Sequence, residues 1–213
     1  MIASRDPSRI PRLHLVTDDE VLGRSGFAAE AERVLRAGGG RIALHLRGPG
    51  LSGRALWKVA APLREIAHRT GSLLLINDRI DVALACGAGV QLRTVSIPVA
   101  RARRLLPGGV LGVSVHTPGE ARRAAVEGAD FVLVGTLYET VSHPEGPVAG
   151  IAIVSALRDL SIPVIGIGGV TVERATEVVA AGGHGVAVIR GVWEAPDPSD
   201  AVLHYLEAME ETE

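Results

Sequence analysis

The stretch Pro163-Val164-Ile165-Gly166-Ile167-Gly168-Gly169-Val170 is followed further along the chain by Gly185-Val186-Ala187-Val188-Ile189-Arg190-Gly191. Each stretch is an apolar strand pattern that ends near glycine and leads into a helix-like segment. Glycine lets the backbone approach a ligand closely, and the first amides of a helix are unpaired donors at the positive end of its dipole. Two such turns near the C-terminal end of a βα repeat form the phosphate site of many (β/α)8 barrels. We therefore expect a phosphate to be bound by Gly168, Gly169, Ile189 and Arg190.

Strand patterns and helix patterns alternate along the whole chain. The strand patterns cover Leu13–Thr17, Ile42–Arg47, Leu73–Asn77, Gly89–Leu92, Val110–Ser114, Phe131–Val134, Val164–Ile167 and Val186–Ile189. The helix patterns cover Ala28–Ala37, Gly53–Arg69, Arg79–Ala85, Pro98–Leu105, Pro118–Glu127, Ile151–Leu160, Val172–Ala180 and Asp197–Ala208. This alternation predicts an α/β protein that forms a single (β/α)8 TIM barrel over residues 1–213, with an N-terminal extension over residues 1–11. A doubly wound open sheet is the alternative, and it usually has fewer strands.

Composition narrows the class of protein. Hydrophobic residues make up 47% of the 213 residues but aromatic residues only 3%, so Ala, Val, Leu and Ile must fill the core. The net charge of −2 gives no indication of a nucleic-acid partner. The single cysteine, Cys86, excludes an internal disulfide and fits a reducing compartment, and no apolar run reaches membrane-spanning length. We expect a cytoplasmic protein that has no contact with a membrane.

Lys58 is the only lysine among 22 basic residues, and it falls in the middle of a predicted helix. A Schiff-base aldolase needs a desolvated lysine in the mouth of the barrel. The sequence therefore argues against this class of barrel enzyme.

Polar residues end the second and third strand patterns. Side chains alternate along a strand, so His45 and Arg47 point the same way, into the barrel, with Arg47 at its C-terminal rim. Arg47 is predicted to bind an anionic group of the substrate, or else to pair with Asp78 as part of the rim. Asn77 and Asp78 follow at the end of the next strand, where we expect a binding role, although Asp78 could also be a helix N-cap.

Ser114 ends the fifth strand pattern, where its hydroxyl could donate a hydrogen bond at the barrel mouth. Thr117, with Glu120 three residues later, fits a capping box and is predicted to be structural. We interpret His116 as a loop histidine rather than as a catalyst.

A polar loop over residues 135–146 is the candidate lid. Its hydroxyl groups, Glu139 and His143 could contact a phosphate or move a proton; a simple solvated loop is the alternative. The Arg190 side chain could add charge-assisted hydrogen bonds to the phosphate, or it could point outward.

Taken together, these motifs resemble the thiamine phosphate synthase and TenI superfamily, whose members are small TIM barrels that handle the thiazole phosphate half of thiamine. The matching stretches are Leu15–Asp18, His45–Arg47, Ile76–Leu84, Gly112–Thr117, Gly128–Asp130 and the two glycine turns. The resemblance implies that the partner is a small phosphorylated thiazole, and it leaves assembly into a homo-oligomer open.

The synthase branch joins the thiazole phosphate to a pyrimidine carried on diphosphate, with Mg²⁺ and basic side chains stabilising the departing diphosphate. This chain departs from that branch at three positions. Pro49 and His143 stand where the synthase has lysines, and Ser96 stands where it has a second acidic ligand of Mg²⁺. Asp78 is then the only implied metal ligand, and one carboxylate makes a poor Mg²⁺ site. We expect Mg²⁺ only if the chain is a synthase.

The TenI branch matches His45-Leu46-Arg47, Val90-Gln91-Leu92 and Tyr138-Glu139-Thr140. An activity of that branch is thiazole tautomerase, a proton transfer that makes a carboxythiazole phosphate aromatic and suits histidine. The resemblance puts the branch's catalytic histidine at Thr136. We therefore expect His45 or His143 to move the proton, and Arg47 to hold the carboxylate.

The leading hypothesis is thus a metal-independent, TenI-like thiazole tautomerase. Its predicted substrate-binding residues are Arg47, Asn77, Asp78, Gln91, Ser114 and Thr140. A divergent thiamine phosphate synthase is the second hypothesis, and a non-catalytic binding or regulatory protein that keeps the phosphate site is the third.

Overall fold

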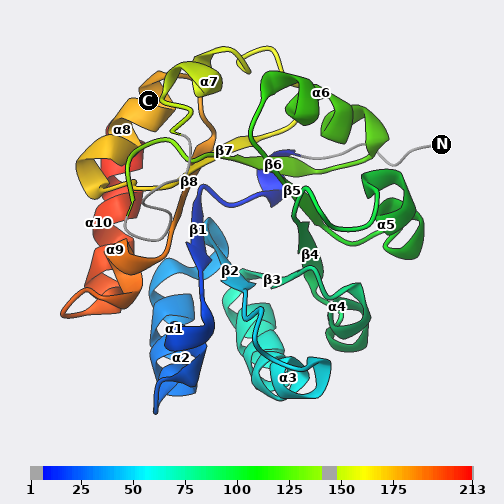
Figure 1. Ribbon diagram of the computed structural model, residues 1–213. Helices are drawn as coiled ribbons and strands as arrows, with labels where there is room; N and C mark the ends of the chain where they lie inside the picture. The colour runs from blue at the N-terminus through cyan, green and yellow to red at the C-terminus, as the bar shows by residue number, and fades with distance from the viewer. Residues whose placement is uncertain (1–6, 141–147, 213) are drawn as a thin grey trace.

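Eight parallel strands form a closed barrel in the computed structural model, which describes residues 7–140 and 148–212. Each strand pairs with its neighbours in sequence, and β1 (Leu13–Val16) pairs with β8 (Gly185–Val188) to close the ring. Figure 1 shows the helices arranged around the outside of this ring. The other strands are β2 (Ile42–Leu46), β3 (Leu73–Asn77), β4 (Gly89–Leu92), β5 (Leu111–Val115), β6 (Phe131–Val134) and β7 (Val164–Ile167). The predicted (β/α)8 barrel is confirmed, and the open sheet is excluded.

Ten α-helices and two 3-10 helices lie in the described part of the chain. They are η1 (Pro7–Arg9), α1 (Asp19–Gly23), α2 (Phe27–Gly38), η2 (Gly39–Arg41), α3 (Gly53–Thr70), α4 (Ile80–Cys86), α5 (Val99–Leu105), α6 (Pro118–Glu127), α7 (Ala152–Ser155), α8 (Val172–Ala180), α9 (Arg190–Trp193) and α10 (Pro198–Glu210). Within this set, no helix is both long and apolar enough to cross a membrane.

Two local differences from the sequence prediction concern helix lengths. The helix predicted over Ile151–Leu160 is only the short α7, because the chain continues in tight turns in which the Leu157 amide donates to the Val154 carbonyl. The short helix α1 is not predicted by periodicity. It begins because the Asp18 carboxylate accepts a hydrogen bond from the Val21 amide, which caps its first turn.

The core has two layers, one between strands and helices and one inside the barrel. As composition predicts, most residues of both layers are aliphatic. Phe131 is the large ring of the inner layer, and Phe27, Trp193 and Tyr205 lie in the outer layer. Gly112 makes room for that ring, because a Cβ atom at this position would lie 2.2 Å from Phe131.

Two fully buried histidines, His14 and His45, interrupt this apolar interior. Their rings meet through a 2.7 Å contact between His14 Nδ1 and His45 Nε2, and His14 Nε2 lies 2.9 Å from the carbonyl oxygen of Pro11. Burial lowers the pKa of His14 to about 3, and burial and the neighbouring His14 lower that of His45 well below its usual value. Both rings are therefore neutral, and since the Pro11 carbonyl can only accept, His14 carries its proton on Nε2 and His45 donates to it.

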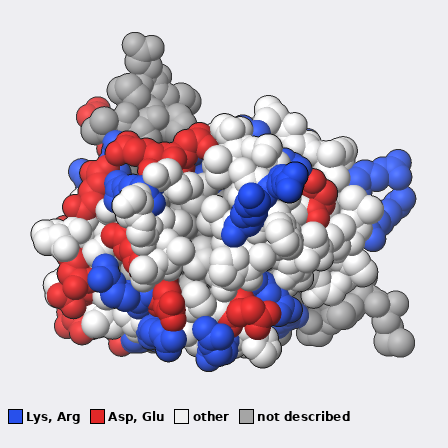
Figure 2. Space-filling model, turned by 90° about the horizontal axis from the view of Figure 1, so that it is seen from below, with Lys and Arg blue, Asp and Glu red and all other residues white. Residues whose placement is uncertain are grey.

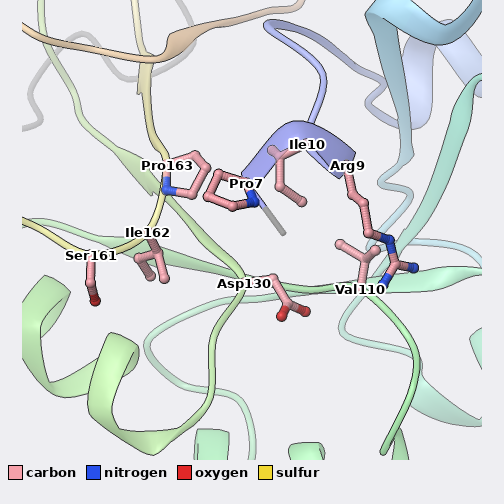
Figure 3. Close-up of a pocket in the computed structure, with 8 residues that line it drawn as sticks. All are labelled: Pro7, Arg9, Ile10, Val110, Asp130, Ser161, Ile162 and Pro163. Carbon is pink, nitrogen blue, oxygen red and sulfur yellow. The ribbon is translucent and has the colours of Figure 1, made fainter. Parts of the chain in front are cut away.

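At the N-terminal end of the barrel, η1 and the loops before β5, β6 and β7 surround a hollow of about 20 Å³ (Figure 3). This volume suits about one water molecule, not a substrate. Beside it, the carboxylate of Asp130 accepts hydrogen bonds from Arg103 Nη2 at 2.6 Å and from the Leu111 amide at 2.7 Å. This end of the barrel is a packed and hydrogen-bonded base.

Candidate functional site

A cavity of about 950 Å³ opens at the opposite end, where the C-terminal ends of the strands meet. Enzymes with this fold carry their active sites at that end. Four arginines contribute to the lining: Arg47 follows β2, Arg93 follows β4, Arg174 lies on α8, and Arg190 begins α9. The cavity is therefore suited to an anionic ligand.

The two glycine turns after β7 and β8 form one wall of this cavity. Gly168 and Gly169 have φ angles of 101° and 64°, in the left-handed region that favours glycine. Their backbone amides donate no hydrogen bond to any described residue. The turn after β8 leads into α9, whose first amides have no partner within the helix. The predicted phosphate-binding residues Gly168, Gly169, Ile189 and Arg190 thus all line the cavity.

Side chains from the loop after β6 cover these turns. Arg190 Nη2 donates to Thr140 Oγ1 at 3.1 Å, so the Arg190 side chain points along the cavity wall and not outward. Arg174 donates to the Gly169 carbonyl at 2.7 Å, and its guanidinium lies 4.4 Å from the centre of the Tyr138 ring. These contacts hold the β6 loop against the β7 turn and place two cations beside the free amides.

The opposite wall comes from β2, β3 and β4, with Arg47, Asn77 and Arg93 in its lining. The pair of Arg47 with Asp78, the alternative to substrate binding by Arg47, is not formed. The Asp78 carboxylate instead accepts hydrogen bonds from Arg93 Nε, the Arg93 amide and the Ser96 hydroxyl. Asp78 does not cap a helix either: α4 has Arg79 at its N-cap position, and Asp78 itself has a φ of 60° that turns it toward β4. Within the described chain the Arg47 guanidinium has no hydrogen-bond or ion-pair partner.

Mg²⁺ does not fit this wall. Mg²⁺ requires several hard oxygen ligands, and both oxygens of Asp78 already accept hydrogen bonds from Arg93 and Ser96. Residues 7–140 and 148–212 contain no group of three or more His, Cys, Asp or Glu side chains that could hold a metal ion. The guanidinium of Arg93 would also repel a cation placed beside Asp78.

Gln91 and Ser114 lie at different depths. Ser114 lines the cavity, whereas Gln91 is fully buried beneath it and does not. Gln91 Nε2 donates to Ser114 Oγ at 3.0 Å. Gln91 is thus placed to orient Ser114 rather than to touch a ligand.

The structure does not support His45 as the residue that moves a proton. His45 lies inside the barrel against His14, fully buried and outside the cavity lining, so its placement disagrees with a role in proton transfer to a ligand. His143 lies outside the described residues. Thr136 does line the cavity, as the resemblance implied for its position.

His116 is the histidine found in the described cavity lining. Its Nδ1 lies 2.6 Å from the Gly135 carbonyl oxygen, so Nδ1 carries the proton and Nε2 is left with a lone pair in the neutral ring. Thr117 accepts from the Glu120 amide and caps α6 as predicted. The expectation that His116 is only a loop residue therefore missed its place at the cavity.

Sequence reasoning also missed Arg93 and Arg174. Both are side chains whose place depends on a partner elsewhere in the chain, Asp78 for Arg93 and Tyr138 for Arg174. Arginine after a strand end is a weak signal that could have drawn attention to Arg93.

On the side of the molecule that Figure 2 shows, acidic and basic side chains are interspersed. This outer face therefore has no cluster of one charge comparable to the four arginines of the cavity. A nucleic-acid-binding face is typically a broad basic patch. The arginines of the cavity, and not this outer face, are the feature that indicates a ligand.

Comparison with known proteins identifies the family and agrees with the fold. The family model described as thiamine monophosphate synthase matches residues 13–192, and the chain therefore belongs to that family. A thiamine-phosphate synthase of Methanoculleus marisnigri is 42% identical over 184 residues, covering 84% of this chain and 86% of the relative. One of Roseiflexus castenholzii is 40% identical over 199 residues, covering 92% of this chain and 86% of the relative.

Among solved structures, the thiamine phosphate pyrophosphorylase from Pyrococcus furiosus superimposes with a TM-score of 0.85 at 28% identity, covering 97% of this chain and 99% of that one. The superfamily predicted from the sequence is thus correct. The preference for the TenI branch is not supported, because the relatives named here are synthases.

Proposed function

We propose that this chain is a cytosolic thiamine-phosphate synthase, which joins a thiazole phosphate to a pyrimidine carried on diphosphate. The family match and the synthase relatives support this reaction over the tautomerase that the sequence motifs favoured. The observation that carries the proposal is the cavity with free backbone amides on one wall and arginines on the other. It offers separate places for two anionic substrates.

The thiazole phosphate binds at the turns after β7 and β8. The free amides of Gly168 and Gly169 and the first amides of α9 donate to its oxygens, and Arg190 adds a charge-assisted hydrogen bond. Ser114 and Thr136, which line the cavity between the two walls, lie where the ring of the bound thiazole would extend.

The pyrimidine diphosphate binds with its anionic end toward β2 and β3. Its methylene carbon forms a bond to the thiazole nitrogen while the bond to the diphosphate oxygen breaks, and the diphosphate leaves with the electron pair. Arg47 has an unpaired guanidinium on this wall and stabilises the charge that develops on the leaving group. Asn77, beside it, orients the substrate.

A second candidate is proton transfer on a carboxythiazole phosphate, which the position of His116 favours. Its Nε2 lone pair in the cavity is suited to a general base. The same phosphate site would serve this reaction, with Arg47 bound to the carboxylate.

Incubation of the purified protein with both synthase substrates, followed by chromatography, tests the proposal. We expect thiamine phosphate to form, and Arg47→Gln to reduce its rate at least tenfold, about the effect of losing one charge-assisted hydrogen bond. Absence of product with and without Mg²⁺ would refute the synthase. Aromatisation of the carboxythiazole phosphate that is lost in His116→Ala would establish the second candidate, and binding without turnover would indicate a non-catalytic protein.

A further inference from the structure

We propose that Arg93 takes the place of a divalent cation at this site: its guanidinium, oriented by Asp78, binds the diphosphate end of the second substrate. This inference rests on the proposed synthase function and assigns the ligand of its β2–β4 wall. It also predicts that the binding of that anion needs no Mg²⁺.

The geometry of Arg93 supports an anion-binding role. Its Nε and its backbone amide both donate to Asp78, which fixes the guanidinium at the end of β4. Its two terminal amino groups have no partner in the described parts of the chain, and Arg93 lines the cavity. Two parallel N–H groups of a guanidinium match two oxygens of a phosphate. Arg93 therefore presents its free donors to the same space as Arg47.

The surroundings of Asp78 explain why an arginine, and not a metal ion, would supply the charge. A carboxylate that accepts three hydrogen bonds has few lone pairs left for a cation. Ser96 reinforces this arrangement, because its hydroxyl donates to Asp78 while its oxygen accepts from the Arg93 amide at 2.9 Å. The three residues form a closed network in which Asp78 positions a cation that belongs to the chain.

Calorimetric titration with inorganic diphosphate tests this inference without turnover. In buffer with EDTA, we expect diphosphate to bind the wild-type protein and Arg93→Gln to weaken that binding at least tenfold. Arg101→Gln, an exposed arginine on α5 outside the cavity lining, should bind as the wild type does. Because Arg93 is half exposed, with 49% of its side chain accessible, the variant should melt at the temperature of the wild type.

Binding that requires added Mg²⁺, or that is unchanged in Arg93→Gln, would overturn the inference. The turnover assay separates the two claims. Product that forms only with Mg²⁺ would refute the role of Arg93 but would agree with the synthase function. No product under either condition would refute the synthase function. In that case the diphosphate titration would still decide whether Arg93 binds the anion.

Discussion

The two ends of the barrel use polar groups in opposite ways. At the N-terminal end, the Asp130 carboxylate accepts hydrogen bonds from Arg103 and from the Leu111 amide beside a hollow of about 20 Å³. At the C-terminal end, glycine amides and the Arg47 guanidinium have no partner in the described chain and face a cavity of about 950 Å³. Polar groups that are paired with each other hold the barrel together, while polar groups left unpaired are available to a ligand.

The largest effect is expected from a substitution of Gly169 in the ligand-binding turn. Gly169 has a φ of 64°, and a Cβ atom added to it would lie 2.5 Å from the Glu139 carbonyl oxygen. We expect Gly169→Ala to displace the turn and weaken the binding of thiazole phosphate about 100-fold, which is about 2.7 kcal/mol. Calorimetry measures the affinity. Gly182→Ala is the matched control, because Gly182 has a φ of 100° but lies after α8, outside the cavity lining. Equal losses of affinity in the two variants would contradict the account.

At the N-terminal base of the barrel, we expect a substitution to lower stability and to leave ligand affinity unchanged. Asp130→Ala leaves Arg103 and the Leu111 amide without their shared acceptor, and we expect a loss of about 2 kcal/mol in the free energy of unfolding with unchanged ligand affinity. Urea denaturation measures the loss. Asp159→Ala, which breaks an exposed pair with Arg122, should cost less than about 0.5 kcal/mol. A loss of affinity in Asp130→Ala would show that the two ends are not independent.

Between the two ends, the buried histidine pair predicts a dependence of stability on pH. In the unfolded chain His14 and His45 titrate near 6.5, whereas in the fold burial keeps both neutral, with the pKa of His14 at about 3. The unfolded state therefore binds more protons below pH 6.5, so stability is complete above that pH and falls as the pH is lowered toward 3. Each ring contributes up to about 1.4 kcal/mol per pH unit in this range.

Urea denaturation at pH 5.5 and 7.5 checks this dependence, and His14→Phe should remove about half of the histidine contribution. Long-range ¹H–¹⁵N NMR gives an independent readout, because both rings should remain neutral with the proton on Nε2 between pH 5 and 8. Titration of either ring near pH 6.5 in the folded protein would contradict the buried pair.

The smallest expected effect concerns Tyr138. Burial and its hydrogen bond to Glu177 raise its pKa to about 12, so the hydroxyl is protonated at neutral pH. Tyr138→Phe removes this exposed bond but keeps the ring beneath Arg174, and we expect the affinity for thiazole phosphate to change less than twofold. A larger change, measured in the same titration, would mean that the hydroxyl and not the ring supports the β7 turn.

The barrel and the phosphate turns could be predicted from the sequence because both depend on local patterns. The alternation of strands and helices fixes the topology, and the glycines after Ile167 identify a turn with exposed amides. The direction of His45 into the barrel also follows from strand alternation, but its depth does not. Depth depends on how the closed ring packs, which here places His45 beneath the cavity and against His14.

The Arg93–Asp78 pair could not be predicted for a related reason. Its members lie on different loops, and Asp78 had two other plausible partners in sequence, Arg47 and the start of α4. Only the left-handed backbone of Asp78 and the return of β4 beside β3 decide between them. The place of His116 could not be predicted either, because the orientation of its ring depends on the carbonyl of Gly135, the residue that follows the next strand, β6.

A crystal structure with bound thiazole phosphate tests the central claim most directly. We predict that the phosphate oxygens lie about 3 Å from the backbone nitrogens of Gly169 and Arg190, within hydrogen-bond distance. A phosphate held instead by Arg47 and Arg93 at the opposite wall, with the amides of the two turns unoccupied, would contradict the account.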